Sequence, residues 1–131
     1  MATPTVRFRV DFGDDCAIGP GKIALLEAIE RTGSLSAAAR LLKMSYRRGW
    51  LLLDSLNSSF RRPVAQLSTG GRGGGGASLT PFGRTLVKAY RRLEADIVRR
   101  ARATLPAVAR EAIGSAETAV HRRPLPRRRM S

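Results

Sequence analysis

The stretch from residue 33 to residue 60 constrains the fold most, because its pattern fits two short helices joined by a tight corner. Ser34 suits the N-cap of the first helix, since a serine hydroxyl accepts a hydrogen bond from a backbone N–H one turn further on. Small and apolar residues then recur at the three- and four-residue spacing of one helix face: Ala37, Ala38, Leu41 and Leu42. The alanines would allow a second helix to cross close by.

The second helix of this stretch has two different faces. Lys43 and Met44 would form the corner, and Ser45 would cap the helix. The apolar face holds Gly49, Leu53, Leu56 and Phe60, and the other face holds Tyr46, Arg47, Trp50 and Asp54. A polar, aromatic and basic face that starts at a helix N-terminus is typical of a helix-turn-helix, whose second helix enters the DNA major groove. Similar short helices also occur in all-α domains without this function.

Charge favours a polyanionic partner. The 24 Lys and Arg residues exceed the 10 Asp and Glu residues, for a net charge of +14. The excess is uneven, with a net of −2 over residues 1–30, +11 over 31–100 and +5 over 101–131. Nucleic acid is the first candidate, with salt-dependent phosphate contacts. An acidic membrane surface is the second, but no basic helix with bulky apolar residues outside a core stands out.

Catalytic and metal chemistry find no support in the composition. Cys16 is the only cysteine and His121 the only histidine, so no zinc cluster, internal disulfide or Cys–His pair is expected. Glu27 and Glu30 are expected to be surface charges. We therefore expect no enzyme, cofactor or metal. Without an apolar run near 18 residues or a signal segment, we expect a cytoplasmic protein, and the Ala-, Arg- and Gly-rich composition suits a bacterium.

The residues before the helix-turn-helix predict a strand and a helix. Residues 6–12 alternate apolar and polar side chains, which predicts a half-buried strand, and residues 13–15 end it in a turn. The strand must pair with later strands or with a second subunit. A helix is expected from Lys22 to about Arg31, with Ile23, Leu25, Leu26 and Ile29 on its apolar side.

A glycine-rich loop follows the helix-turn-helix. Two extended runs, residues 64–67 and 77–79, flank a loop that holds six glycines and Arg72. A flexible linker and an RGG-like RNA-binding segment are alternatives. Because apolar residues resume on both sides, we expect a hairpin, which directly after a helix-turn-helix would be a wing. Its glycines would let the backbone approach phosphates or the minor groove, where Arg72 would insert.

A long helix is predicted after the hairpin. Thr80 and Pro81 form a strong start signal, and the helix should continue to about Leu105. Its expected apolar stripe is Phe82, Leu86, Ala89, Leu93 and Ile97. Because little of the chain remains to cover the far end, we expect a homodimer helix, with folding back over the core as the alternative. Pro106 should break the helix, residues 107–120 should form a weaker one, and residues 121–131 a disordered basic arm.

These residues carry a family resemblance. KIALLEAIERTGSLSAAARLLKMSYRRGWLLLDSLN, followed by TGGRGGGGASLTPFGRTLVKAY, resembles the N-terminal winged helix domain of the ModE molybdenum-responsive regulators, which is related to LysR-type domains. The similarity covers roughly residues 6–100, and its most specific parts are residues 45–50 and 69–80. It implies that the helix opened by Ser45 reads DNA and that the first and long helices form a homodimer. ModE proteins carry molybdate-binding domains after the dimer helix, and only about 30 residues follow here, so molybdate binding is not expected.

The sequence therefore predicts a mainly α fold with a small β-hairpin (α+β). Residues 1–105 would form a winged helix-turn-helix domain with a long C-terminal dimerisation helix at about 80–105, and residues 106–131 a tail. We expect a homodimeric, sequence-specific regulator of transcription that binds double-stranded DNA. A sequence-indifferent architectural protein and a dimeric adaptor that has lost DNA binding are the alternatives. The candidate DNA-binding residues are Ser34, Ser36, Ser45, Tyr46, Arg47, Arg48, Trp50, Gly70, Gly71, Arg72 and Arg84.

Overall fold

The computed structural model of the chain describes residues 4–68 and 75–113. The chain divides into two compact units, one of residues 7–95 and the other of residues 1–6 with 96–131. The division falls within the longest helix, so the predicted boundary near residue 105 remains a prediction. The mainly helical α+β class is confirmed.

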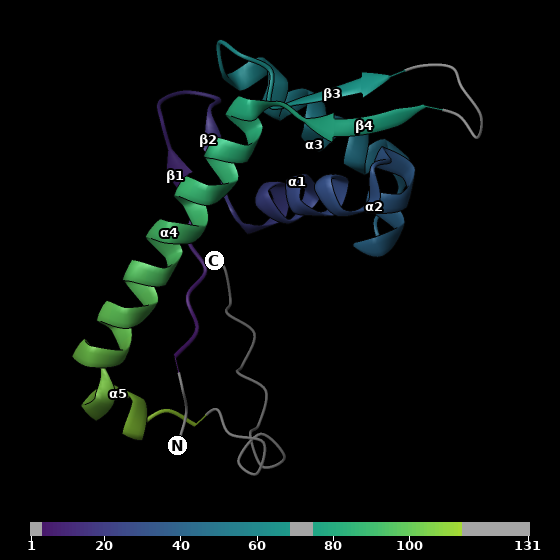
Figure 1. Cartoon of the computed structure of the whole chain (residues 1–131). Helices are drawn as coiled ribbons and strands as arrows, with labels where there is room; N and C mark the ends of the chain where they lie inside the picture. Colours follow the sequence, from purple (N-terminus) through teal and green to yellow (C-terminus); the bar gives the residue numbers. More distant parts are fainter. Residues whose placement is uncertain (1–3, 69–74, 114–131) are drawn as a thin grey trace, which may run out of the picture. The chain divides into compact units, whose positions relative to one another are not determined.

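Three helices form the core of the larger unit: α1 (Pro20–Thr32), α2 (Leu35–Leu41) and α3 (Tyr46–Ser59). They pack together beside a β-hairpin (Figure 1). The predicted apolar side of α1 is confirmed, because its four members are fully buried: Ile23, Leu25, Leu26 and Ile29. Gly33 ends α1 with a φ of 74°, a conformation that glycine adopts without steric cost, and its N–H donates to the Ile29 carbonyl at 2.8 Å.

Both predicted helix caps of the helix-turn-helix are confirmed. The Ser34 hydroxyl accepts from the Ala37 N–H at 3.1 Å, and the Ser45 hydroxyl accepts from the Arg48 N–H at 3.1 Å. The predicted inner face of α2 was wrong in part, because Leu41 is 49% exposed. The buried side instead begins at Leu35, the first residue of the helix, and continues at helical spacing with Ala38, Ala39 and half-buried Leu42.

The predicted N-terminal strand is present but short. β1 (Val10–Asp11) pairs antiparallel with β2 (Ala17–Ile18) across the predicted turn. Phe8 lies outside the strand, because its ring stacks on Tyr90 with the centroids 4.5 Å apart and its carbonyl accepts from the Tyr90 hydroxyl at 2.8 Å. A long helix therefore holds the beginning of this segment in place of a sheet partner. Phe12, predicted to be half-buried, is exposed.

The predicted hairpin is confirmed by its pairing. β3 (Ala65–Ser68) and β4 (Gly76–Leu79) are antiparallel, with Ala65 opposite Leu79. The N–H of Ala77 also donates to the carbonyl of Gly33 at 2.8 Å, which fastens β4 to the junction between α1 and α2. Gly70, Gly71 and Arg72 lie in the loop between the strands, outside the described residues.

The start signal of the long helix is confirmed. In α4 (Pro81–Thr104) the Thr80 hydroxyl accepts from the Gly83 N–H at 2.9 Å. The buried line of α4 is Gly83, Leu86 and Tyr90, whereas Ala89 and Leu93, both in the predicted apolar stripe, are exposed. Pro106 starts a separate short helix, α5 (Pro106–Arg110), so the predicted weak helix of residues 107–120 is present only to Arg110, and residues 111–113 are not helical. The rest of that segment and the predicted arm, residues 114–131, lie outside the described residues.

An ion-pair network links α4 to α1. The Arg91 guanidinium donates to both carboxylate oxygens of Glu27, at 2.7 and 2.9 Å, and to Glu94 at 2.8 Å. The hydrogen bonds from Arg91 lower the pKa of Glu27, although partial burial opposes them. Glu27 is thus a partly exposed surface carboxylate, as expected, and it pairs with Arg91.

Replacing Gly83 with alanine should strongly destabilise the larger unit. A Cβ at this position would overlap the Val64 carbonyl oxygen, a backbone atom that cannot rotate away. We expect Gly83→Ala to lower the free energy of unfolding by at least about 2 kcal/mol in urea denaturation. Gly21→Ala is the control, because a Cβ there meets nothing within 4 Å in the described structure. Equal stabilities of the two variants would contradict the close α4–β3 approach.

The Glu27–Arg91 pair should contribute stability that depends on pH. The folded-state pKa of Glu27 lies below its ordinary value of 4.5, so its contribution is present above pH 4.5 and is lost as the pH falls through the folded-state pKa. We expect Glu27→Gln to cost about 1 kcal/mol or less at pH 7, because the side chains of both partners are about 40% exposed, and we expect this cost to shrink as the pH falls below 4.5 through the folded-state pKa. Thermal unfolding from pH 7 to pH 3 measures this. Glu111→Gln, at an exposed carboxylate, is the control, and a pH-independent cost would argue against the pair.

Candidate nucleic-acid interface

The first turn of α3 points outward because its inner side is closed by small residues. A Cβ on Gly49 would lie 3.4 Å from the Ala39 Cβ and 3.5 Å from Leu35 Cδ1, so α3 crosses α2 at close range. The Ser45 cap fixes where the helix begins. Gly49, Leu53 and Leu56 face the core, as predicted. The exposed residues of the same part of α3 include Tyr46, Arg47, Arg48, Trp50 and Asp54.

The outward side of α3 holds the aromatic and basic side chains that the sequence indicated. Tyr46 is 53% and Trp50 42% exposed, which is more than is usual for large aromatic residues in a small domain. Arg47 and Arg48 are also exposed. Among residues 4–68 and 75–113, neither guanidinium has a carboxylate partner. Their donors are therefore available to an external acceptor such as a phosphate or a base edge.

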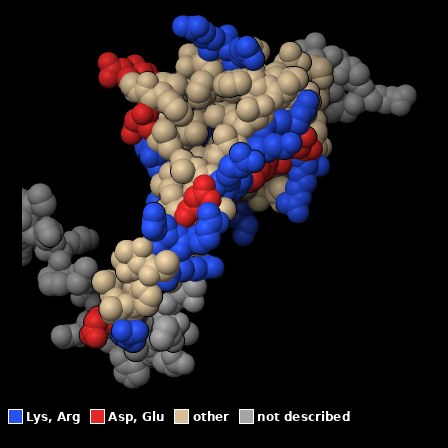
Figure 2. Space-filling view, turned by 60° about the vertical axis from the view of Figure 1, so that its left-hand side comes forward, with Lys and Arg blue, Asp and Glu red and all other residues tan. Residues whose placement is uncertain are grey.

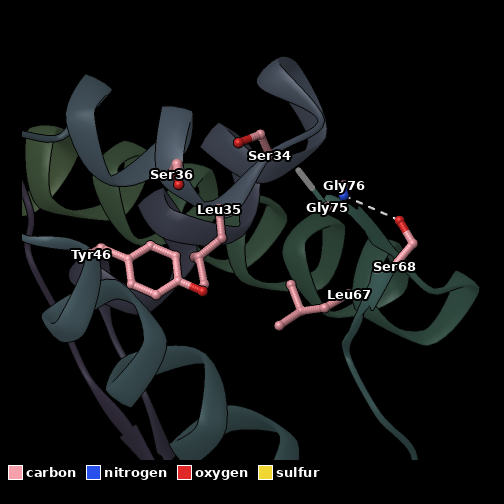
Figure 3. Close-up of a pocket in the computed structure, with 8 residues that line it drawn as sticks. All are labelled: Ser34, Leu35, Ser36, Tyr46, Leu67, Ser68, Gly75 and Gly76. Atoms are coloured by element: carbon pink, nitrogen blue, oxygen red, sulfur yellow. Dashed lines mark hydrogen bonds between the residues drawn. The ribbon is translucent and has the colours of Figure 1, made fainter. Parts of the chain in front are cut away.

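A hollow of about 280 Å³ lies between the start of α2, the start of α3 and the loop ends of the two hairpin strands. Figure 3 shows Tyr46 and Leu67 projecting toward it from opposite sides. It is lined by Ser34, Leu35, Ser36, Tyr46, Leu67, Ser68, Gly75 and Gly76. The predicted candidates Ser34, Ser36 and Tyr46 are thus neighbours in space.

Two of the lining hydroxyls already have partners. Ser34 caps α2, and the Ser68 hydroxyl accepts from the Gly76 N–H at 3.2 Å. Leu67 and Ser68 were not among the sequence candidates. One hint of a role for them was present in the sequence, their position between the helix-turn-helix and the glycines. That they line this hollow follows only from the folded structure, in which they pair with Ala77 and Gly76.

Arg84 lies in a different place from the other candidates. Its guanidinium donates to the Leu79 carbonyl at 3.1 Å and lies 3.9 Å from a Glu30 carboxylate oxygen. It lines a separate shallow hollow with residues of α1 and α4. A DNA contact from Arg84 would have to compete with these partners. Gly70, Gly71 and Arg72 lie outside the described residues, so their predicted contacts stay predictions.

Charge alone does not single out one DNA-binding face. Figure 2 shows acidic side chains lying among the basic ones on the face in view. Two arginines of α4 lie close to carboxylates of α1: Arg84 is 3.9 Å from Glu30, and Arg91 is 2.7 Å from Glu27. Arg47 and Arg48 at the start of α3 differ from these two arginines, because no carboxylate of the described residues pairs with them.

Other chemistry finds little support in the described residues. In the ranges 4–68 and 75–113, no three His, Cys, Asp or Glu side chains gather in a way that could hold a metal ion. Cys16 is a half-buried free thiol. None of the helices that the structure describes is long and apolar enough to cross a membrane.

Known proteins similar to this chain are molybdenum-related regulators and binding proteins. The chain is 44% identical over 82 residues to the molybdenum-pterin-binding protein MopB of Rhodobacter capsulatus, which covers 63% of the chain and 30% of MopB. It is 40% identical over 90 residues to the molybdenum transport protein ModE of Azotobacter vinelandii, covering 69% of the chain and 33% of that protein.

A third relative has a name that states its role. The DNA-binding transcriptional dual regulator ModE of Escherichia coli is 37% identical over 71 residues, which covers 54% of this chain and 27% of the relative. The matches thus span a third or less of the length of these relatives. No protein-family model matches the chain. At 37–44% identity to these proteins, and with a mainly helical fold that includes a hairpin and a long helix, the chain has a domain of the ModE type, as its sequence motifs suggested.

Proposed function

We propose that this chain is a DNA-binding transcriptional regulator that recognises a specific sequence in double-stranded DNA as a homodimer. The observation that carries the proposal is the outward start of α3, where Tyr46, Arg47 and Trp50 are exposed beside the hollow shared with the hairpin. The names of the ModE relatives support regulation of transcription. Since the matches cover only a third or less of those relatives, the activity of this chain is inferred.

We expect different residues to contact the bases, the phosphates and the flanking DNA. Arg47 and Arg48, at the N-terminal turn of α3, would enter the major groove, where a guanidinium fork suits the O6 and N7 of guanine. The hydroxyls of Ser36 and Tyr46 line the hollow and would hold a phosphate. Trp50 would lie one turn along the helix against the groove wall. Arg72, with Gly70 and Gly71, would reach the flanking backbone or minor groove.

A homodimer would use the exposed apolar residues of the long helix. Leu93 on α4 is 42% exposed, and further exposed apolar side chains follow in the other unit: Leu105, Val108 and Ile113. An amphipathic helix with an uncovered apolar side is stabilised by packing on a second helix. A dimer would present two α3 helices to two half-sites about one helical turn apart. The expectation that this chain does not itself bind molybdate stays a prediction.

Replacing Arg47 with alanine should weaken binding to a selected site by about 1–3 kcal/mol, because a bidentate base contact would be lost. Fluorescence anisotropy with a duplex obtained by in vitro selection measures the loss. Arg62→Ala is the matched control, because it removes the same charge from an exposed residue beyond the opposite end of α3. We expect this control to lower affinity for selected and random duplexes alike and by less.

The same assay separates the proposal from a sequence-indifferent architectural role. Unlabelled random duplex should compete far less well than the selected duplex for the wild-type protein. Equal competition by the two duplexes would contradict sequence-specific regulation. An Arg47→Ala variant with unchanged affinity for the selected site would remove Arg47 from the base-reading residues.

Replacing Leu93 with arginine should weaken the proposed dimer. Analytical ultracentrifugation of the wild-type protein should give about twice the chain mass of 14.2 kDa. An arginine in an apolar helix contact would lose its hydration without gaining an ion-pair partner, which costs free energy. The Leu93→Arg dimer should therefore dissociate at protein concentrations at which the wild-type protein is still a dimer. The control, Arg92→Ala, changes an exposed polar neighbour on α4. A wild-type protein that sediments as a monomer at every concentration would contradict the dimer.

A further inference from the structure

The side chain of Asn57 makes hydrogen bonds that the proposed function leaves unexplained. Asn57 lies near the end of α3, on the same helix as the proposed DNA-reading residues but about two and a half turns beyond them. Its Oδ1 accepts from the Val64 N–H at 2.7 Å and from the Ala65 N–H at 3.3 Å, and its Nδ2 donates to the Ala65 carbonyl at 3.1 Å. One amide thus engages two consecutive residues at the start of β3.

The same short segment is also held by the start of α4. The Thr80 hydroxyl donates to the Pro63 carbonyl at 2.7 Å, and the Thr80 N–H donates to the Val64 carbonyl at 3.0 Å. Gly83 lets α4 approach this carbonyl with no room for a Cβ. The base of the hairpin is therefore gripped from both sides, and Val64 is fully buried between them.

Of the side chains that form hydrogen bonds with this base among the described residues, Asn57 alone belongs to α3. Thr80 joins the hairpin to α4, and the Gly33 carbonyl joins β4 to the α1–α2 junction. Neither contact involves α3, so neither depends on how α3 is rotated about its axis. The Asn57 amide does, because a rotation or shift of α3 would break its bonds to Val64 and Ala65.

We propose that Asn57 is a positioning residue that fixes the hairpin relative to the DNA-reading start of α3. This inference rests on the proposed function. β3 extends four residues from Ala65, or roughly 13 Å, so a tilt of about 10° at its base would move its far end by about 2 Å. Displacements of that size are enough to break a hydrogen bond to a phosphate. Asn57 would thereby let α3 and the hairpin engage one DNA site together.

The test uses two substitutions of different severity, in the full chain. Asn57→Ala removes all three hydrogen bonds. Asn57→Asp keeps an acceptor for the Val64 and Ala65 N–H groups but cannot donate to the Ala65 carbonyl, so it guards against a variant that fails to fold. Ser58→Ala is the matched control, because it alters an exposed neighbour on α3. A cooperative thermal transition for each variant shows that it is folded.

The first measurement needs no DNA. In a Cys16→Ser background, nitroxide labels at Asp54→Cys on α3 and Ser78→Cys on β4, both exposed positions, report the distance between helix and hairpin by pulsed electron resonance. We expect a narrow distance distribution in the parent and in Ser58→Ala. It should broaden or shift in Asn57→Asp and more so in Asn57→Ala. An unchanged distribution in Asn57→Ala would overturn the inference whatever the DNA result.

The second measurement is a hydroxyl-radical footprint on a selected duplex at saturating protein. If Asn57 has a positioning role, its variants should protect the centre of the bound site from cleavage as well as the wild-type protein does. Their protection of the DNA at the flanks should fall at least threefold. Loss of stability alone would weaken all protections together, and more protein would restore them. A full-length footprint from Asn57→Ala would overturn the positioning role. If the wild-type protein shows no preferred site while the label distances respond, the proposed function fails and Asn57 keeps only its role at the junction.

Discussion

The close crossing of α2 and α3 is the contact on which the rest of the site depends. Gly49 faces Ala39 and Leu35 at a distance that leaves little room for a side chain, and neighbouring Leu53 and Leu56 are buried behind it. Because this side of α3 is closed, Tyr46, Arg47 and Trp50 lie on its exposed side. The exposed aromatic and basic surface is thus a consequence of packing on the opposite side of the same helix.

A second constraint joins that helix to the hairpin. The peptide groups from Pro63 to Ala65 form hydrogen bonds with Asn57 on one side and with Thr80 on the other, while the Gly33 carbonyl accepts from β4. Buried peptide groups that lack partners are costly, so these bonds also hold the chain together where it changes direction. The Ala77–Gly33 hydrogen bond lies at the other end of the hairpin, beside the hollow that the hairpin shares with α2 and α3.

Local signals in the sequence predicted most of the fold. Ser34, Ser45 and Thr80 act as caps as expected, because capping depends on residues only two or three positions apart.

The buried faces of α2 and α4 were predicted less well. Where a helix has apolar residues on two neighbouring sides, its periodicity does not say which side packs on the core. Leu41 was predicted on the inner face of α2 and Leu93 in the apolar stripe of α4, and both are exposed. The Arg91–Glu27 pair and the Asn57 contacts could not be predicted, because they join residues 64 and 7 or 8 positions apart through the tertiary fold. Of the proposed DNA contacts, the outward side of α3 was predictable, whereas the contribution of Leu67 and Ser68 to the hollow was not.

The most direct test of the central claim is a nuclear magnetic resonance titration of the isotope-labelled chain with a selected DNA duplex. If the start of α3 enters the groove beside the hairpin, the largest backbone amide shifts should fall on residues 45–50, with further shifts around residues 34–36 and 67–76. Shifts confined to α1 and the β1–β2 pair, with residues 45–50 unaffected by saturating DNA, would contradict the account.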